Sequence, residues 1–236
     1  MLTLEDLTLS RDGFSLSANM EVNGPGITAV IGPSGSGKSS LLSLIAGFDQ
    51  PDQGRVLWEG QDLTGIAPGK RPVAVLFQDN NLFPHLDLVA NVALGASPRA
   101  KPSPEVVARA RTALAHVGLE GVEHRRPGAL SGGQQSRAAL ARLTLTDRPV
   151  ILLDEAFSAL GPALRSEMLD LVAALLPETT IMMVTHDPED ARRWAGATIF
   201  VENGQVQAPQ PTEQLFADPP EGLSLYLHGA NREHSG

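Results

Sequence analysis

Residues 27–39 read ITAVIGPSGSGKS, an apolar run that stops at a glycine-rich loop, and a helical pattern follows from Lys38 to Gly47. The loop, Gly32 to Ser39, matches the P-loop pattern GxxxxGK[ST] in the strand-to-helix context which that pattern requires. Its glycines let backbone N–H groups turn inward around an anion at the positive end of a helix. Lys38 can then reach the terminal phosphates of a nucleotide, and the Ser39 hydroxyl can coordinate Mg²⁺. The stretch therefore predicts a phosphate site.

Strand and helix patterns alternate on both sides of this loop, which predicts parallel strands and a sheet covered on both faces. Strand patterns occupy residues 2–9, 14–22, 27–31, 55–59, 73–77, 150–153, 180–184 and 197–201, with Val206 after an Asn203-Gly204 turn. A helical pattern covers 164–176. Between Pro84 and Arg148 the strand patterns fade, and Val107, Ala110, Leu114 and Val117 recur at helical spacing. We expect an α/β fold with a P-loop NTPase (RecA-like) core, an antiparallel β part and an inserted α-helical subdomain.

The domain boundaries follow from these changes in pattern. We expect one domain over residues 1–236, with the RecA-like and β core in 1–83 and 149–208 and the helical subdomain in 84–148. Residues 209–236 form a C-terminal extension, and its last residues, 230–236, read as a frayed polar tail.

Composition excludes several classes of protein. The 236 residues are 42% hydrophobic, enough for a sizeable core, and the net charge of −9 opposes non-specific adhesion to nucleic acid or anionic lipid. The chain has no cysteine, so disulfides, thiolate metal sites and cysteine nucleophiles are unavailable. The first residues lack the basic and apolar pattern of a signal peptide, and no run is apolar for long enough to span a membrane. Any membrane role should therefore come through a partner.

Two carboxylates end the apolar strand pattern of residues 150–153. On its own, Asp154-Glu155 more often marks a strand entering a solvated loop. With a P-loop in the same chain, Asp154 is expected to hold the Mg²⁺ shell, and Glu155 to orient and polarise an attacking water.

A second glycine-containing segment is Leu130-Ser131-Gly132-Gly133-Gln134. Ser131 with Gln134 three residues later predicts an ordinary capping box for the helix that follows. A cap does not need two glycines, and glycines at a helix start let a phosphate approach the backbone. We therefore also expect a second anion site here.

The order of these motifs resembles that of the nucleotide-binding subunits of ABC transporters, over about residues 1–205. The resemblance implies an ATP hydrolase that binds ATP and Mg²⁺. The implied ATP-binding residues are Gly32, Pro33, Ser34, Gly35, Ser36, Gly37, Lys38, Ser39 and Ser40. The implied Mg²⁺ residues are Ser39, Gln78 and Asp154, and the implied catalytic residues are Glu155, His186 and Gln78.

By the same resemblance, two subunits face each other head to tail. Ser131, Gly132, Gly133 and Gln134 of one copy then complete the ATP site of the other. His186 would contact the γ-phosphate, and Gln78 would connect the metal and water site to a transmembrane permease. Taken singly, Gln78 and His186 are weak signals, because a polar residue after a strand is usually only a polar terminus.

A narrower resemblance is to the ATPases of thiamine importers. It rests on residues 71–73, 76–83, 91–95, 157–160 and 163–169. Leu82 and Phe83 fit core packing and a permease-facing groove equally well. The resemblance implies a peripheral subunit on the cytoplasmic face of a bacterial inner membrane, a permease, and a periplasmic thiamine-binding protein acting indirectly. The alternatives are importers of polyamines, anions or iron, exporters, and ABC proteins that act on nucleic acid. Proteins of the last class usually need a coiled-coil insertion or a second ATPase cassette, so we expect no nucleic-acid partner.

The chain also departs from the family pattern. Gly161 stands where an Asp usually communicates across the dimer, and Ala156 where a Pro commonly follows the catalytic Glu. The turn at residues 10–13 lacks the Tyr that stacks on adenine in many relatives, which leaves Phe14 or Arg11 as substitutes.

Overall fold

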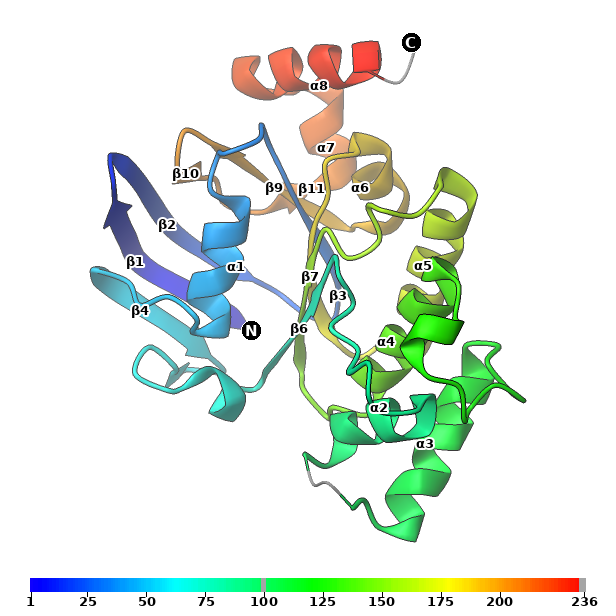
Figure 1. The fold of residues 1–236 in the computed structure, drawn as a ribbon. Coiled ribbons are helices and arrows are strands. Elements are labelled where there is room, and N and C mark those ends of the chain that lie inside the picture. Colours follow the sequence, from blue (N-terminus) through cyan, green and yellow to red (C-terminus); the bar gives the residue numbers. More distant parts are fainter. Residues whose placement is uncertain (99–100, 234–236) are drawn as a thin grey trace. The chain divides into compact units, whose positions relative to one another are not determined.

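The structure is a computed structural model that describes residues 1–98 and 101–233 (Figure 1). The chain divides into two compact units. The first unit comprises Met1–Val75, Pro149–Glu155 and Glu178–Gly236, and the second comprises Leu76–Arg148 and Ala156–Pro177. The second unit contains the predicted helical subdomain, 84–148, together with residues 76–83 and 156–177. The boundaries of the predicted subdomain stay a prediction.

A mixed sheet forms the frame of the first unit. Its strands are β1 (Leu2–Arg11), β2 (Phe14–Val22), β3 (Gly26–Ile31), β4 (Gln53–Trp58), β5 (Gln61–Asp62), β6 (Val73–Phe77), β7 (Val150–Asp154), β8 (Thr180–Val184), β9 (Ala197–Glu202), β10 (Gln205–Val206) and β11 (Gln210–Pro211). They are ordered β5-β4-β1-β2-β10-β9-β3-β8-β7-β6, and β11 pairs with β9. The predicted strands are confirmed to within a few residues; only the two-residue strands β5 and β11 were not predicted.

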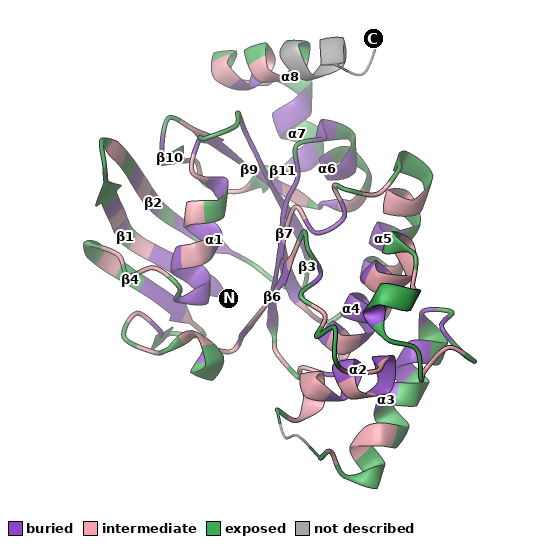
Figure 2. Cartoon of the chain, in the orientation of Figure 1, coloured by how far each residue is buried: buried purple, intermediate pink, exposed green. Residues whose placement is uncertain are grey.

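Two kinds of pairing meet in this sheet. Strands β9, β3, β8 and β7 pair in parallel, while β5, β4, β1 and β2 pair antiparallel. The predicted combination of a parallel core with an antiparallel β part is confirmed. The parallel strands are almost wholly buried, as expected for strands covered on both faces (Figure 2).

Helix α1 (Lys38–Ala46) carries the P-loop and packs into the main core of the first unit. Its buried residues Leu41, Leu44 and Ile45 belong to one apolar cluster with Leu4 of β1 and Leu152 of β7. The helix ends at Gly47, whose left-handed backbone is the predicted glycine C-cap. The P-loop is therefore mounted on a helix held by the antiparallel and the parallel strands.

Buried Arg71 closes the other end of α1. Its guanidinium donates to the backbone carbonyls of Leu44 and Ile45 and to those of Thr64 and Ile66. A cation bonded to the last carbonyls of a helix satisfies acceptors that have no partner within the helix. Arg71 thus links the end of α1 to the loop after β5.

The second unit is built mainly from helices, listed here with their bounds: α2 (Leu88–Ala96), α3 (Pro104–His116), α4 (Gly132–Thr144) and α5 (Pro162–Leu175), with short 3₁₀ turns at Pro127–Ala129 in this unit and Pro68–Lys70 in the first. The helical spacing seen around Ala110 and Leu114 is confirmed, because both residues are fully buried on α3. Helices α2, α3 and α4 pack against one another.

The C-terminal part of the first unit contains α6 (Pro188–Trp194), α7 (Thr212–Ala217) and α8 (Glu221–Glu233). The prediction of a frayed tail from residue 230 is wrong up to Glu233, since α8 continues to that residue; residues 234–236 lie outside the described part of the chain. Apolar contacts anchor α8, because Leu223 is fully buried and Tyr226 lies beside Phe200 of β9. Within the described residues, no helix is both long and apolar enough to cross a bilayer.

Candidate functional site

The start of α1 is open to an anion. Its N-cap is Gly37, with φ of 112° and no side-chain cap. A side chain at Gly37 would meet Phe14 and Leu16, both about 2.9 Å from the Cβ position, and would also be strained at this φ. Glycine is therefore required by backbone and packing together. The first N–H groups of α1 remain available to a phosphate.

Lys38 lies against the loop it follows. The side chain is largely buried, and Nζ donates to the carbonyl oxygens of Gly32 and Pro33, each at 2.8 Å. Burial lowers the pKa of Lys38, and the nearby charges of Glu155 and Asp154 oppose that shift. The hydroxyl of Ser36 is also buried, and it has no hydrogen-bond partner among the described residues. A cation and a spare donor thus face the same loop, which fits a phosphate.

Ser39 and Asp154 bring two oxygen ligands together. Ser39 Oγ donates to Asp154 Oδ1 at 3.1 Å, across 115 residues of sequence. Burial raises the pKa of Asp154, the Ser39 hydrogen bond lowers it, and the neighbouring charge of Glu155 raises it further. A hydroxyl and a carboxylate suit Mg²⁺, which keeps most of its water and takes few protein ligands. No larger cluster of metal-ligating side chains occurs in residues 1–98 and 101–233, and Mg²⁺ needs none.

Glu155 directly follows β7, and His186 follows β8, the strand that lies between β3 and β7. Glu155 adopts a left-handed backbone with φ of 49°, and its N–H donates to the Val184 carbonyl at 3.3 Å. His186 comes two residues after β8 and is exposed. The P-loop, Asp154-Glu155 and His186 therefore follow the carboxyl ends of β3, β7 and β8, three neighbouring parallel strands. In open α/β sheets, ligands bind at this edge.

The second unit holds the other predicted residues. Ser131 is the N-cap of α4: its Oγ accepts from Gln134 N at 3.3 Å, and its own N–H donates to Gln134 Oε1 at 3.1 Å. The predicted capping box is confirmed. Gly132 faces open space, whereas a Cβ at Gly133 would collide with Leu164 of α5. A side chain at position 133 would therefore require Leu164 to move, a packing contact that the sequence did not reveal.

The segment after exposed Gln78 is bound to α4. Arg142 donates to the carbonyls of Asn80 and Asn81 at 2.8 and 2.7 Å, and Asn80 Nδ2 donates to Ser136 Oγ at 3.3 Å. A few residues later Phe83 is 46% exposed. Core packing, one of two predicted roles for Phe83, is therefore wrong for this residue, while Leu82 is half-buried.

The two adenine partners proposed from the sequence make contacts within the chain, and both stay predictions. Arg11 Nη1 is paired with Asp49 Oδ1 at 2.7 Å, and the ring of Phe14 packs under Gly37. Beside the P-loop is a cavity of about 300 Å³, lined by Gly13, Phe14, Ser15, Pro33, Ser34, Gly35, Ser36, Glu202 and Asn203. Asn203 was predicted only as part of a turn, and Glu202 was not singled out, because a charged residue at a strand end is usually only a polar terminus.

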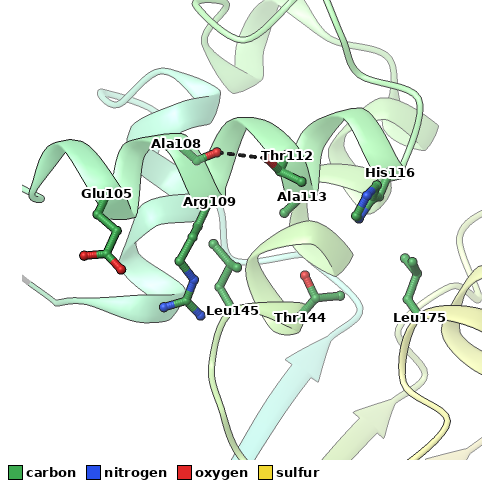
Figure 3. Close-up of a pocket in the computed structure, with 9 residues that line it drawn as sticks. All are labelled: Glu105, Ala108, Arg109, Thr112, Ala113, His116, Thr144, Leu145 and Leu175. Atoms are coloured by element: carbon green, nitrogen blue, oxygen red, sulfur yellow. Dashed lines mark hydrogen bonds between the residues drawn. The ribbon is translucent and has the colours of Figure 1, made fainter.

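A second hollow, of about 480 Å³, lies in the second unit between α3 and the ends of α4 and α5 (Figure 3). Its wall is mostly apolar, with Arg109 and His116 projecting from α3 beside Leu145 and Leu175. None of the residues predicted to bind or hydrolyse nucleotide lines it.

Comparisons with known proteins agree with this geometry. The ABC transporter family profile matches residues 16–158. The chain is 55% identical to the "Thiamine import ATP-binding protein ThiQ" of Cereibacter sphaeroides over 96% of this chain and 99% of that protein. It is 47% identical to the Brucella suis protein of the same name, over 96% and 95%.

Solved structures show the same fold. A dimeric ATP-binding cassette in a post-hydrolysis state with ADP and Pi has a TM-score of 0.75 at 28% identity, over 90% of this chain and 99% of that one. The cbiO1 component of the ABC transporter complex cbiONQ from Clostridium perfringens has a TM-score of 0.79 at 26% identity, over 92% and 90%. Sequence, fold and the motifs at the strand ends agree, and the chain belongs to the ABC transporter family of ATP-binding proteins.

Proposed function

We propose that this chain is the ATP-binding and ATP-hydrolysing subunit of an importer for thiamine or its phosphate esters. One observation carries the proposal, which joins site and relative. The carboxyl ends of three adjacent strands carry Lys38, Ser39, Asp154, Glu155 and His186, in a chain 55% identical to a thiamine import ATP-binding protein. The assignment of ATPase chemistry rests on the residues at the strand ends, and the assignment of the solute rests on the similarity to this relative.

Each residue of the first unit has a defined task. Lys38 leaves the carbonyls of Gly32 and Pro33 for the terminal phosphates, and the N–H groups at the start of α1 bind phosphate oxygens. Ser39 and Asp154 would hold Mg²⁺, which would neutralise charge on the transferred phosphoryl group. Gln78 belongs to the second unit and stays a predicted Mg²⁺ ligand. Glu155 orients the attacking water, and His186 contacts the γ-phosphate.

A second copy completes the site. Ser131, Gly132, Gly133 and Gln134 of one subunit bind the ATP held by the P-loop of the other, so ATP joins two subunits head to tail. A solved relative with this fold is described as dimeric. Exposed Gly132 lets a phosphate approach the start of α4, and Ser131 can share its hydroxyl between the cap and that phosphate.

The permease is expected to dock on the segment after Gln78, where Phe83 is exposed. Asn91 supports this segment, because its side chain accepts from Phe83 N at 2.7 Å and donates to the carbonyls of Phe83, Leu86 and Asp87. A supported loop with an exposed aromatic ring suits a coupling helix. We retain residues 84–148 as the helical subdomain and place the subunit on the cytoplasmic face of a bacterial inner membrane.

Glu155→Gln tests the hydrolytic assignment. ATP and Mg²⁺ binding should persist, while turnover falls roughly 10²- to 10⁴-fold, as for the loss of a general base. Binding is measured by calorimetry and turnover by phosphate release. Near-normal hydrolysis would show that Glu155 has another role.

The solute is tested in the assembled transporter, with its permease and binding protein in nanodiscs. ATP hydrolysis should be faster when the binding protein carries thiamine than when it is empty. Phe83→Asp should weaken the stimulation while leaving nucleotide binding intact, because it places a charge in the apolar docking surface. A complex that ignores thiamine and its phosphates but responds to a polyamine, an anion or iron would keep the ATPase assignment and overturn the solute.

A further inference from the structure

The C-terminal helix α8 reaches the turn that carries His186. The hydroxyl of Tyr226 donates to the backbone carbonyl of His186 at 2.9 Å, across 40 residues of sequence. Both residues belong to the first unit. Tyr226 is the only tyrosine in the chain, and its ring lies 6.4 Å from that of Phe200 on β9, which orients it.

The His186 turn is held on both sides of the histidine. Thr185 Oγ1 donates to Asp190 Oδ2 at 2.8 Å and accepts from the Asp187 N–H at 3.1 Å. Asp187 caps α6 by accepting from the Glu189 N–H at 3.0 Å. These bonds bind residues 185 and 187 to α6, whereas the His186 side chain stays exposed. Tyr226 adds a contact to the histidine itself, from a separate helix.

The same helix also touches the wall of the cavity beside the P-loop. A Cβ at Gly222 would collide with the carboxylate of Glu202, so the first turn of α8 packs directly on that side chain. Glu202 lines the cavity together with Pro33 and Ser34. With Leu223 fully buried between these contacts, α8 is anchored at Glu202 and at His186. It therefore meets two strand-end segments of the proposed ATP site.

We propose that Tyr226 is a positioning residue for ATP hydrolysis: its hydroxyl holds the backbone of His186 so that the imidazole meets the γ-phosphate of bound ATP. The proposal rests on the role proposed above for His186. Because the hydrogen bond is made to the backbone, it orients the histidine without occupying either ring nitrogen. Helix α8 thus takes part in sensing whether the nucleotide carries a γ-phosphate.

The first test is kinetic. Tyr226→Phe removes only the hydroxyl and keeps the ring beside Phe200, and turnover should fall roughly 3- to 10-fold, the effect of losing one neutral hydrogen bond. The KM for ATP should stay within about twofold, since the P-loop contacts are intact. Leu225→Ala, one residue away and 69% exposed, is the matched control and should keep full turnover.

His186→Ala separates the two proposals. If it hydrolyses ATP normally, the role of His186 is wrong and the role of Tyr226 falls with it. If His186→Ala is impaired while Tyr226→Phe equals the unmodified protein, the role of His186 stands and the inference alone is overturned. Melting temperatures of all variants identify a loss that comes only from unfolding, which would also contradict the inference.

The second test needs no turnover. With one tyrosine, 3-fluorotyrosine labelling places a single ¹⁹F signal at position 226. In a Glu155→Gln background the signal should move on adding Mg-ATP and much less on adding Mg-ADP. The ATP response should be lost in His186→Ala. A signal unaffected by ATP, while calorimetry shows saturation, would mean that α8 only stabilises the fold.

Discussion

The two helices that begin in glycine-containing motifs, α1 and α4, differ in how their first backbone N–H groups are satisfied. At α1 the N-cap is Gly37, which offers no side chain, so the first N–H groups stay available. At α4 the N-cap is Ser131, which with Gln134 completes a capping box. The start of α1 therefore has no side-chain partner for its first N–H groups, whereas the start of α4 satisfies two of its donors within its own chain. Under the proposed function, α1 would bind the nucleotide of its own subunit, and α4 would contact the nucleotide of a second copy.

Lys38→Ala tests the open helix start and should have the largest effect. Its Nζ donates to two carbonyl oxygens of the loop, and losing its charge-assisted contact with phosphate should weaken ATP binding by roughly 10²-fold. Equilibrium binding of a fluorescent ATP analogue measures this. Lys70→Ala removes an exposed lysine on the turn at Pro68–Lys70 and should bind normally. Similar affinities for the two variants would remove Lys38 from the phosphate site.

Asp154→Asn tests Mg²⁺ binding separately from phosphate binding at the P-loop. Mg²⁺ affinity in the presence of ATP should fall roughly 10- to 100-fold, while metal-free ATP binding persists. The raised pKa of Asp154 means that the folded chain holds this proton more tightly than the unfolded chain. The free energy of unfolding should therefore decrease as pH rises from the usual pKa range of Asp through the raised pKa of Asp154. Asn at this position does not titrate, so it should remove this pH-dependent loss of stability.

Thermal unfolding without nucleotide, followed from about pH 4 upward, measures the stability difference between Asp154→Asn and the unmodified chain. We expect the variant to gain relative stability as pH rises. A variant less stable at neutral pH would show that the carboxylate supports the fold rather than burdening it.

Substitutions at Ser131 distinguish the cap from the nucleotide contact. Ser131→Ala should cost about 1 kcal/mol of stability through the lost cap and weaken ATP-dependent dimerisation roughly tenfold. Ser131→Asp keeps a capping oxygen and so preserves the unfolding temperature, but its charge repels phosphate and should abolish the dimer. Sedimentation in the Glu155→Gln background reports dimerisation. A dimer that tolerates Asp at 131 would contradict the head-to-tail site.

Gly161→Asp concerns a third helix start and should have the smallest effect. Gly161 is the N-cap of α5, has an ordinary extended backbone and open space at Cβ, and provides no side-chain cap. An Asp there should cap the helix, and with the lost glycine entropy the gain is about 1 kcal/mol, or roughly 2–4 °C. Differential scanning calorimetry measures this change in melting temperature. No gain in melting temperature would show that α5 does not unfold with the rest of the chain.

Most of the fold could be predicted because its determinants are local. The strand patterns at 14–22, 73–77 and 180–184 match β2, β6 and β8 to the residue, and the glycine C-cap at Gly47 is where the sequence placed it. The capping box at Ser131 was equally readable, since its two partners are three residues apart. The C-terminal helix was missed, because α8 is anchored by contacts of Leu223 and Tyr226 with the rest of the first unit rather than by its own pattern.

The sequence by itself determined the phosphate loop, the acidic strand end and the capped helix of the signature segment, since each depends on neighbours within a few residues. Only the tertiary structure decided which side chains surround them. A Cβ at Gly133 would meet Leu164, Arg11 pairs with Asp49, and the Tyr226 bond to His186 joins α8 to the turn after β8. Each of these contacts joins residues 31 to 40 positions apart in the chain, and such contacts are set by strand order and helix packing, which no local pattern specifies.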